Sequence, residues 1–457
     1  MSTTRRGFIA GGAVAALGAA GIYELVDQLV GSGPKRPAGA LLPEQHLLEG
    51  VRIVHQDEVE VLVPPLHHRV LTGTIPSRSY DLRDAQTTLE HVLSGLEDDY
   101  TATPAGLGVT VAWGRPYFEH FVAGATRRYL PLDRRAGSSV LLNARTFPSD
   151  PSGTVLERND LAIQLRSDVL QHIDDAEQRL RKAGLFHVTS VRKGFAGGGF
   201  AEGHSLPKQM AIAANVPGAD LIPDGAELFL GFTSTQKAGF GPGKIANFET
   251  LGYVDLRGRE YFANGTHMHL SHVTEDLEQW YINFDFDERV TTAFRPGLQV
   301  RQGAQTVAQG PKQAQDVSDV IRGYKSSGRI GHSASIQVAS RLGHHVTGPD
   351  GTSYPKGTAI PIRADFNTLD NPFAYSDNPD MLQGGAQAGI HFLVFNPSSD
   401  DFHRNRLAMD GVLPGGMKLP LQPRGRNQGF NSILQTTHRQ NFLVPPRRHR
   451  SFPLAEL

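Results

Sequence analysis

Two segments of this sequence have the same order of strand and helix patterns. In the first, β-rich runs at residues 106–114 and 160–167 precede a helix pattern at 168–182 and a further strand at 186–191. Strands that bury one face under helices form a layered α+β unit. We therefore predict that this half of the chain is one sheet covered by helices.

The helix of this first half has clear signals at both ends. Ser167 can cap its N-terminus, and Gly184 follows its last turn. Between them, apolar residues recur at helical spacing and indicate one buried face. These residues are Val169, Leu170, Ile173, Ala176 and Leu180.

The second half repeats the arrangement. A strand is predicted at residues 265–273, Thr274 can cap a helix that begins at Glu275, a buried strand follows at 389–396, and a further helix ends near Met409. Two such halves predict an α+β fold of duplicated ferredoxin-like halves. No linker of disordered composition separates the halves, so both are assigned to one domain, residues 103–457.

The residues before this domain are mixed in character and rich in proline. Residues 34–102 contain a strand-like run at 59–63 and a helix pattern at 85–96. We expect them to form an amino-terminal extension that wraps the main fold.

The first 33 residues are predicted to be an export signal. Arg5 and Arg6 precede an apolar run at residues 10–22, which is too short and too weakly apolar for a membrane-spanning helix. The pattern resembles a twin-arginine (Tat) signal. We expect export to the periplasm, cell envelope or extracellular space, with no integral membrane span in the mature protein. An uncleaved amino-terminal anchor is the alternative.

Composition limits the chemistry of the protein. The 457-residue chain has no cysteine, which excludes disulfides, thiolate ligation of haem and cysteine nucleophiles. Any metal must then be held by His, Asp, Glu or Tyr. The formal net charge of −1 gives no reason to expect nucleic acid as a partner, which favours a small molecule.

The stretch from Ser327 to Phe366 holds the main candidate site. His332 lies in a run of small residues that would leave room for a flat ligand against its imidazole. Arg363 follows it after a turn signal at residues 348–351. The two side chains could face each other across a cofactor. The ordinary alternatives are a packed histidine and an arginine in a salt bridge.

From residue 106 to residue 453 the sequence resembles the dye-decolourising (DyP-type) peroxidases. This resemblance implies the fold of that family, in which two ferredoxin-like halves form a dimeric α+β barrel architecture. The similar runs occur in the family's order: the opening strand, residues 160–182, 228–232 and 264–266, the segment from His332 to Arg363, and residues 442–446.

The resemblance also implies a cofactor and residue roles. The family's iron-binding histidine corresponds to His332, which would ligate haem b (iron protoporphyrin IX) and gain basicity from an acceptor on its other nitrogen. Arg363 corresponds to the distal arginine, which binds a haem propionate or hydroperoxide and stabilises developing negative charge. Asn367 would add a neutral donor. The implied partners are hydrogen peroxide and an organic reductant, and a homo-oligomer is left open.

The sequence departs from the family at residues 194–198. The family carries a Gly-x-x-Asp-Gly motif whose aspartate moves protons for peroxide, and Gly197 stands at that position here. Glu202 and His204 are near enough in sequence to replace it as general acid and base. The alternative for both is a solvated loop.

A second histidine cluster gives a different hypothesis. His267 and His269 would lie on one face of a strand, with His272 at its end, a spacing that suits copper or zinc. A partly buried polar strand face is the simpler interpretation. Three functions therefore remain: an exported haem peroxidase, a non-catalytic haem or ligand-binding protein on the same fold, and a histidine-based metal-binding envelope protein.

Overall fold

The structure of the protein is a computed structural model. It describes residues 41–56, 59–76, 80–196, 206–232, 245–257, 260–304, 316–348, 351–373 and 386–457. The predicted export signal at residues 1–33 lies outside these ranges.

The first half of the fold is a four-stranded antiparallel sheet with two helices. Its sheet order is β9-β3-β8-β4, so the first strand lies between the third and the fourth, as in a ferredoxin-like unit. The elements are β3 (His67–Thr74), α3 (Leu82–Asp99), β4 (Gly108–Gly114), β8 (Leu161–Ser167), α6 (Leu170–Lys182) and β9 (His187–Phe195).

The second half has the same strand order. Its sheet runs β17-β11-β16, with β15 and β14 both paired to β16, and all of these pairs are antiparallel. The elements are β11 (Thr266–Glu275), α9 (Leu277–Asn283), α10 (Phe286–Ala293), α11 (Val317–Ser327), α12 (His332–Ser340), β14 (Ile362–Arg363), β15 (Phe366–Thr368), β16 (Gly389–Asn396), α13 (Ser399–Met409) and β17 (Leu434–Val444).

The two half-sheets join at both edges. Strand β17 pairs with β4, and β15 pairs with β9 through Asn367 and Phe195. Because β11 also pairs with β17, the sheet closes on itself. Its inner side holds an apolar cluster to which both halves contribute, including Val70, Ala162, Leu270, Phe395 and Phe442. The predicted α+β fold of duplicated ferredoxin-like halves is confirmed.

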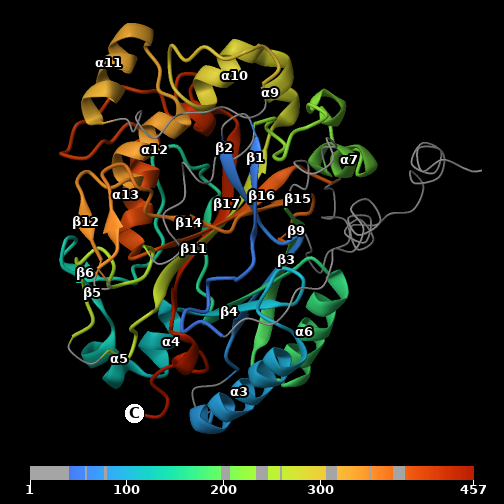
Figure 1. Cartoon of the computed structure of the whole chain (residues 1–457), viewed down its shortest axis with the longest axis vertical. Coiled ribbons are helices and arrows are strands. Elements are labelled where there is room, and N and C mark those ends of the chain that lie inside the picture. Colours follow the sequence, from blue (N-terminus) through green and yellow to red (C-terminus); the bar gives the residue numbers. More distant parts are fainter. Residues whose placement is uncertain are drawn as a thin grey trace, which may run out of the picture.

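The outer side of the sheet differs between the halves. In the first half, α3 and α6 pack directly on the strands, with Leu89, Leu93 and Ile173 in one core with Ile163 and Leu165. In the second half, α12 and α13 cover the strands. Figure 1 shows α3 and α6 at the lower right and α12 and α13 at the left.

Short elements complete the chain. The hairpin predicted around residues 348–351 is present as the pair β12 and β13. These elements are β1 (Arg52–Gln56), β2 (Val59–Val63), α4 (Arg115–His120), α5 (Ala123–Tyr129), β5 (Leu132–Asp133), β6 (Ser138–Ser139), β7 (Val155–Leu156), α7 (Leu206–Ala213), β10 (Val254–Asp255), β12 (Val346–Thr347) and β13 (Ser353–Tyr354).

Three local expectations are corrected. The region 34–102 was expected to wrap the fold, but β3 lies inside the sheet and α3 packs on it. The helix expected from Glu275 begins at Leu277, because β11 continues through Glu275 and Asp276 forms the cap by accepting from the backbone N–H of Gln279. Ser167 accepts from the N–H of Val169 at the end of β8, and no side chain caps α6.

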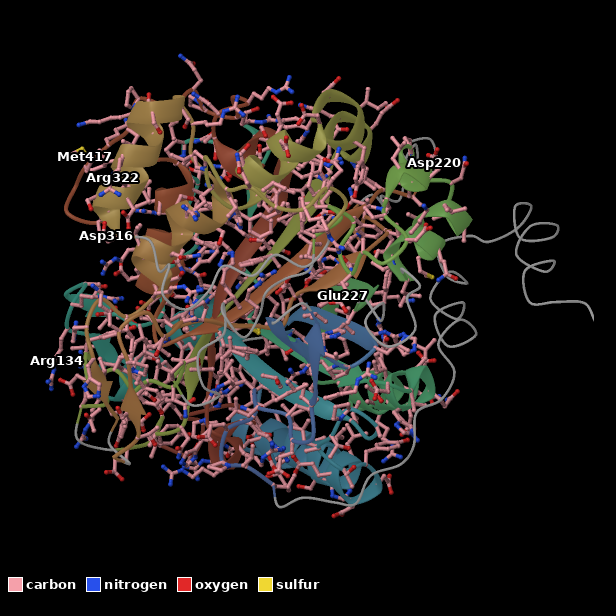
Figure 2. The ribbon with its side chains drawn as sticks, turned by 45° about the horizontal axis from the view of Figure 1, so that its top comes forward. Arg134, Asp220, Glu227, Asp316, Arg322 and Met417 are labelled. Atoms are coloured by element: carbon pink, nitrogen blue, oxygen red, sulfur yellow. The ribbon has the colours of Figure 1, made fainter. Side chains whose placement is uncertain are left out.

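The surface carries both charged and apolar side chains, such as Arg322 and Met417. Figure 2 places Asp316, Arg322 and Met417 together at one side of the molecule and Asp220 at another, whereas Glu227 lies nearer the middle and is 8% exposed. In the described parts of the chain, no helix has the length and apolar character needed to cross a membrane.

Candidate functional site

A cavity of about 270 Å³ lies between α12, α13 and the outer side of the second half-sheet. This volume is close to the lower end of the range of small-molecule sites, roughly 300–1,000 Å³. Apolar side chains from helix, strand and loop make up much of its wall, and arginines contribute charge. The apolar members include Leu230, Phe232, Phe294, Ile336, Ile390, Phe392, Val394, Phe402, Met409 and Phe430.

The chain positions His332 on the helical wall through a close backbone contact. His332 is the first residue of α12, and Gly331 is its N-cap. A Cβ atom at residue 331 would lie 2.3 Å from the carbonyl oxygen of Phe294, so glycine is required there. The imidazole packs against Phe430 with ring centroids 4.6 Å apart.

The His332 imidazole is neutral and has an unsatisfied nitrogen. Burial, followed by the charges of Arg363 and Arg406, lowers the pKa of His332 to about 3. Its Nδ1 atom is buried and has no hydrogen-bond partner among the described residues. The expected acceptor on this second nitrogen is therefore not present in that part of the chain. Leaving such an atom without a partner costs roughly 1–3 kcal/mol.

Arg363 lines the same cavity from β14, so the structure brings the two main predicted residues to one site. Its guanidinium is held by Asp365, with Nε 2.9 Å from Oδ1 and Nη2 2.6 Å from Oδ2. The bidentate pair fixes the orientation of the guanidinium and balances its charge. The salt bridge that was considered as the ordinary alternative is thus present together with the position at the cavity.

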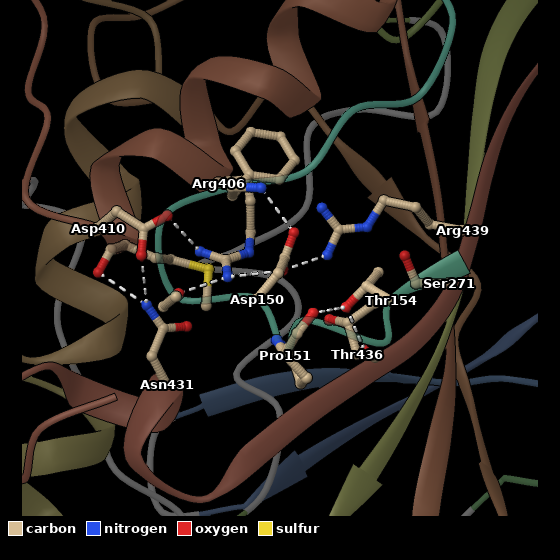
Figure 3. A network of polar contacts seen from close by, with 12 residues as sticks. Asp150, Pro151, Thr154, Ser271, Arg406, Asp410, Asn431, Thr436 and Arg439 are labelled. Carbon is tan, nitrogen blue, oxygen red and sulfur yellow. Dashed lines mark hydrogen bonds and ion pairs between the residues drawn. The ribbon is translucent and has the colours of Figure 1, made fainter. Parts of the chain in front are cut away.

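A second group of charged side chains, Asp150, Arg406 and Arg439, also lines the cavity, and Figure 3 shows their contacts. Asp150 accepts hydrogen bonds from Arg439 at 2.6 Å and from Arg406 at 3.2 Å. Arg406 also binds Asp410 at 2.9 Å, and Asp410 in turn accepts from Asn431. These contacts hold the 143–156 segment against α13 and β17.

Glu275 is a third charged group at the cavity, and it lies on the sheet wall at the end of β11. Burial and then the negative charge of Asp365 raise the pKa of Glu275 to about 8. Its Oε2 atom is buried without a partner among the described residues. This carboxyl is therefore predominantly protonated at neutral pH.

Asn367, the third predicted residue of the site, lies away from the cavity wall. It is 2% exposed and donates to the backbone carbonyl of Glu227. Gly197, Glu202 and His204 lie outside the described residues.

The second histidine cluster does not form a metal site in the described ranges. His269 uses both ring nitrogens, at 2.7 Å from Asn441 Oδ1 and 2.6 Å from Ser271 Oγ. His272 lies on the opposite side of β11, with its ring 5.0 Å from that of His391. Within these ranges no group of three or more potential ligands is close enough to hold an ion.

Four residues of the cavity were not recognised from the sequence. Arg406 and Arg439 read as ordinary helix and strand charges, and Asp150 precedes a proline in a loop. Glu275 was assigned to the first turn of a helix, because an acidic residue after a threonine is typical of a helix start. For Arg439 the sequence offers one signal: it lies shortly before the apolar run at 442–444, so it is expected within a strand.

The closed sheet of two ferredoxin-like halves, with a cavity under the helices of the second, is the fold of the DyP-type peroxidases. A DyP-type peroxidase from Cellulomonas bogoriensis is similar with a TM-score of 0.50 and 18% identity, over 89% of this chain and 96% of that chain. The encapsulated DyP-type peroxidase from Mycobacterium smegmatis gives a TM-score of 0.48 and 13% identity, over 86% and 96%. A variant of DypB from Rhodococcus jostii RHA1 in complex with heme gives 0.48 and 12%, over 85% and 95%.

By sequence, the chain belongs to the family of unknown function DUF7405, which it matches over residues 65–446. This match includes β3 and ends just after β17, so it covers both halves of the closed sheet. No curated protein matches the sequence.

Proposed function

We propose that the protein binds haem b in the cavity, with His332 as the iron ligand, and reduces hydrogen peroxide while oxidising an organic reductant in one-electron steps. The observation that carries this proposal is His332 itself. It is a neutral imidazole with a buried, unpartnered Nδ1 on the wall of an apolar cavity that also contains arginines. The fold of the DyP-type peroxidases supports it.

The donor set suits this cofactor. A neutral imidazole ligates haem iron, and the chain has no cysteine that could compete. The apolar walls suit a porphyrin ring, and Arg341, Arg406 and Arg439 at the cavity are suitable partners for its propionates. Haem would supply the electrons for reduction of peroxide.

The residues of the chain then have separate tasks. The phenylalanine and aliphatic walls exclude water from the reacting molecules. Arg363, oriented by Asp365, presents a fixed guanidinium that stabilises negative charge on peroxide oxygen. Asp150 accepts hydrogen bonds from Arg406 and Arg439 and so holds their guanidinium groups in place.

The decisive experiment compares two histidine variants. The parent protein is purified with haem supplied and its absorbance is recorded, and then His332→Ala and His345→Ala are treated in the same way. His345 is a matched control, because it is exposed and its Nε2 contacts Ser353 at 2.7 Å. The parent and His345→Ala should show the same Soret band, and His332→Ala should lose or shift it. An unchanged band in His332→Ala would remove this residue as the ligand, and no band in the parent would reject haem binding.

A second candidate function is haem binding without turnover. Glycine at residue 197, where related enzymes keep an aspartate, favours it. Rapid mixing of the haem-loaded protein with peroxide separates the two functions: a prompt spectral change followed by oxidation of a dye supports a peroxidase, and a static spectrum supports a carrier or sensor.

We also propose that residues 1–33 direct export of the folded protein. The twin arginine before an apolar run supports this proposal. A reporter fused to residues 1–33 should be exported, and replacement of Arg5 and Arg6 by lysine should stop its export.

A further inference from the structure

Glu275 is buried at the cavity without the partners that a charged group needs. It ends β11, where residues 271, 273 and 275 share one face of the strand, and all three side chains line the cavity. Only 7% of its surface is exposed. A buried carboxylate without a partner is strongly unfavourable, so this position requires either a proton or a ligand.

The two carboxyl groups among the described lining residues are bonded in different ways. Both oxygens of Asp150 have partners: Oδ1 accepts from Arg406 and Arg439, and Oδ2 accepts from the backbone N–H of Phe147. Oε2 of Glu275 has no hydrogen-bond partner in the described ranges. Glu275 is therefore the carboxyl group of this wall that is able to exchange a proton with a molecule in the cavity.

The surroundings of Glu275 favour its neutral form and keep it close to titration. Burial raises its pKa to about 8, and Asp365, the partner of Arg363, contributes through its negative charge. Tyr281 on α9 is the other titratable group coupled to Glu275, and its own pKa is raised by burial. The Tyr281 hydroxyl donates to the carbonyl of Phe229 at 2.7 Å, so it is engaged there.

We propose that Glu275 carries the proton in this cavity, in place of the carboxylate that the sequence lacks at Gly197. This role rests on the proposed function. Glu275 gives its proton to the oxygen atom of hydrogen peroxide that departs as water, and it takes a proton from the other oxygen atom. The bonding pair of the O–O bond leaves with the water, and the two electrons that balance this step are those that bound haem would supply.

The position of Glu275 suits this task. It lies on the sheet wall, whereas His332 lies on the helical wall of the same cavity, so a molecule between the two walls is accessible to both. Arg363 lies on the sheet wall as well. Its ion-pair partner Asp365 also interacts electrostatically with Glu275. A fixed positive charge and a neutral acid on one wall are the two groups that breakage of a peroxide bond requires.

The first arm of the test uses the protein without haem. An infrared titration should show a carboxylic acid carbonyl band that disappears as the pH is raised through about 8. Glu275→Gln should lack this band. Glu249→Gln is the matched control and should keep it, because Glu249 is another glutamate with a raised pKa but accepts from the backbone of Asn264 outside the cavity. Persistence of the band in Glu275→Gln would overturn the assignment.

The second arm uses the haem-loaded protein and stopped-flow mixing with hydrogen peroxide. Glu275→Gln should keep the Soret band and react about 10²- to 10⁴-fold more slowly, the usual contribution of a general acid–base group. The rate of the parent should fall as the pH is raised through about 8, and this dependence should vanish in Glu275→Gln. Glu275→Asp, which keeps an acid, should retain a pH dependence and part of the rate.

The outcomes separate the two proposals. Equal rates for the parent and Glu275→Gln, with haem bound in both, would overturn the role of Glu275 and leave the peroxidase function intact. Failure of the parent to bind haem would overturn the proposed function and this role with it. If Glu275→Gln does not fold, a Glu275→Asp variant with a reduced rate and a retained pH dependence would support the role, and one with the parent rate and no pH dependence would overturn it.

Discussion

Removal of the Asp150 carboxylate should destabilise the protein strongly, because two buried arginines depend on it. Asp150 and Arg439 have 3% and 1% of their side chains exposed, and Arg406 has 9%. Asp150 also accepts from the backbone N–H of Phe147 at 2.6 Å. Asp150→Ala therefore leaves Arg439 with a backbone carbonyl, that of Arg145, as its remaining hydrogen-bond acceptor in the described ranges.

The expected size follows from this burial. Breaking a buried ion pair by deleting one partner typically costs about 3–5 kcal/mol, because the remaining charge stays in the protein interior. Arg406 keeps Asp410, which moderates the loss at that side. We expect the free energy of unfolding to fall by about 3–5 kcal/mol.

A matched control is available at the surface. Asp174 binds Arg69 at 2.8 Å, but 45% of its side chain is exposed and Arg69 keeps Glu177 at 2.6 Å. Asp174→Ala should therefore cost no more than about 1 kcal/mol. Urea denaturation followed by the fluorescence of the two buried tryptophans, Trp113 and Trp280, measures both variants. A loss for Asp150→Ala no larger than that for Asp174→Ala would refute the reasoning.

Three further outcomes are expected. Arg363→Leu should keep haem bound but slow the reaction with peroxide by ~10²-fold or more in stopped-flow, and Arg363→Lys should recover little because it cannot reproduce the bidentate pair with Asp365. Gly197→Asp should add little to the peroxide rate of the parent, because Glu275 already carries the proton, whereas a rise of ~10²- to 10⁴-fold in the parent would contradict the role of Glu275. The free energy of unfolding should fall as the pH drops from about 6.5 to 3, because buried histidines bind protons in the unfolded chain and not in the folded one. Burial lowers the pKa to about 3 for His46, His68, His267, His272 and His332. A flat profile by urea denaturation would contradict this expectation.

The strands and helices with strong patterns were predictable from the sequence. The apolar run at 389–396 coincides with β16, and the helix predicted to end near Met409 is α13. The continuous apolar run of β16 matches a strand that is buried on both faces, and Ser398 forms a capping box with Asp401 at the start of α13. Where local pattern and tertiary environment agree, the sequence is sufficient.

β3 was missed because its environment is unusual. The strand opens with His67, His68 and Arg69, which read as a surface segment, but nearly every residue of β3 is buried. His68 stacks on Phe366 on the inner side of the closed sheet, with ring centroids 4.8 Å apart. Polar residues that point into a closed sheet leave no alternation of polar and apolar residues to detect.

The candidate site was predicted in part. His332 and Arg363 were identified by resemblance, and the structure brings them to one cavity. Glu275 was assigned to a helix because Thr274 is a good cap, but pairing of β11 with β17 extends the strand to Glu275 opposite Leu434. The size of the cavity depends on how far α12 and α13 stand from the sheet, and no local pattern encodes that distance.

The closed sheet has a consequence for the order in which the protein is made. The first half can pair its own strands once residue 195 has left the ribosome, because β3, β8 and β9 all precede that point. Its outer strands β4 and β9 then present open edges until β17 and β15 emerge. The edge of β9 stays open to other chains until β15 is made, and the edge of β4 stays open until β17, which ends at Val444, is made. The ligand cavity, whose wall includes Leu434, Thr436 and Arg439 of β17, is complete only once β17 has been made, so a ligand cannot contact its whole wall before that stage.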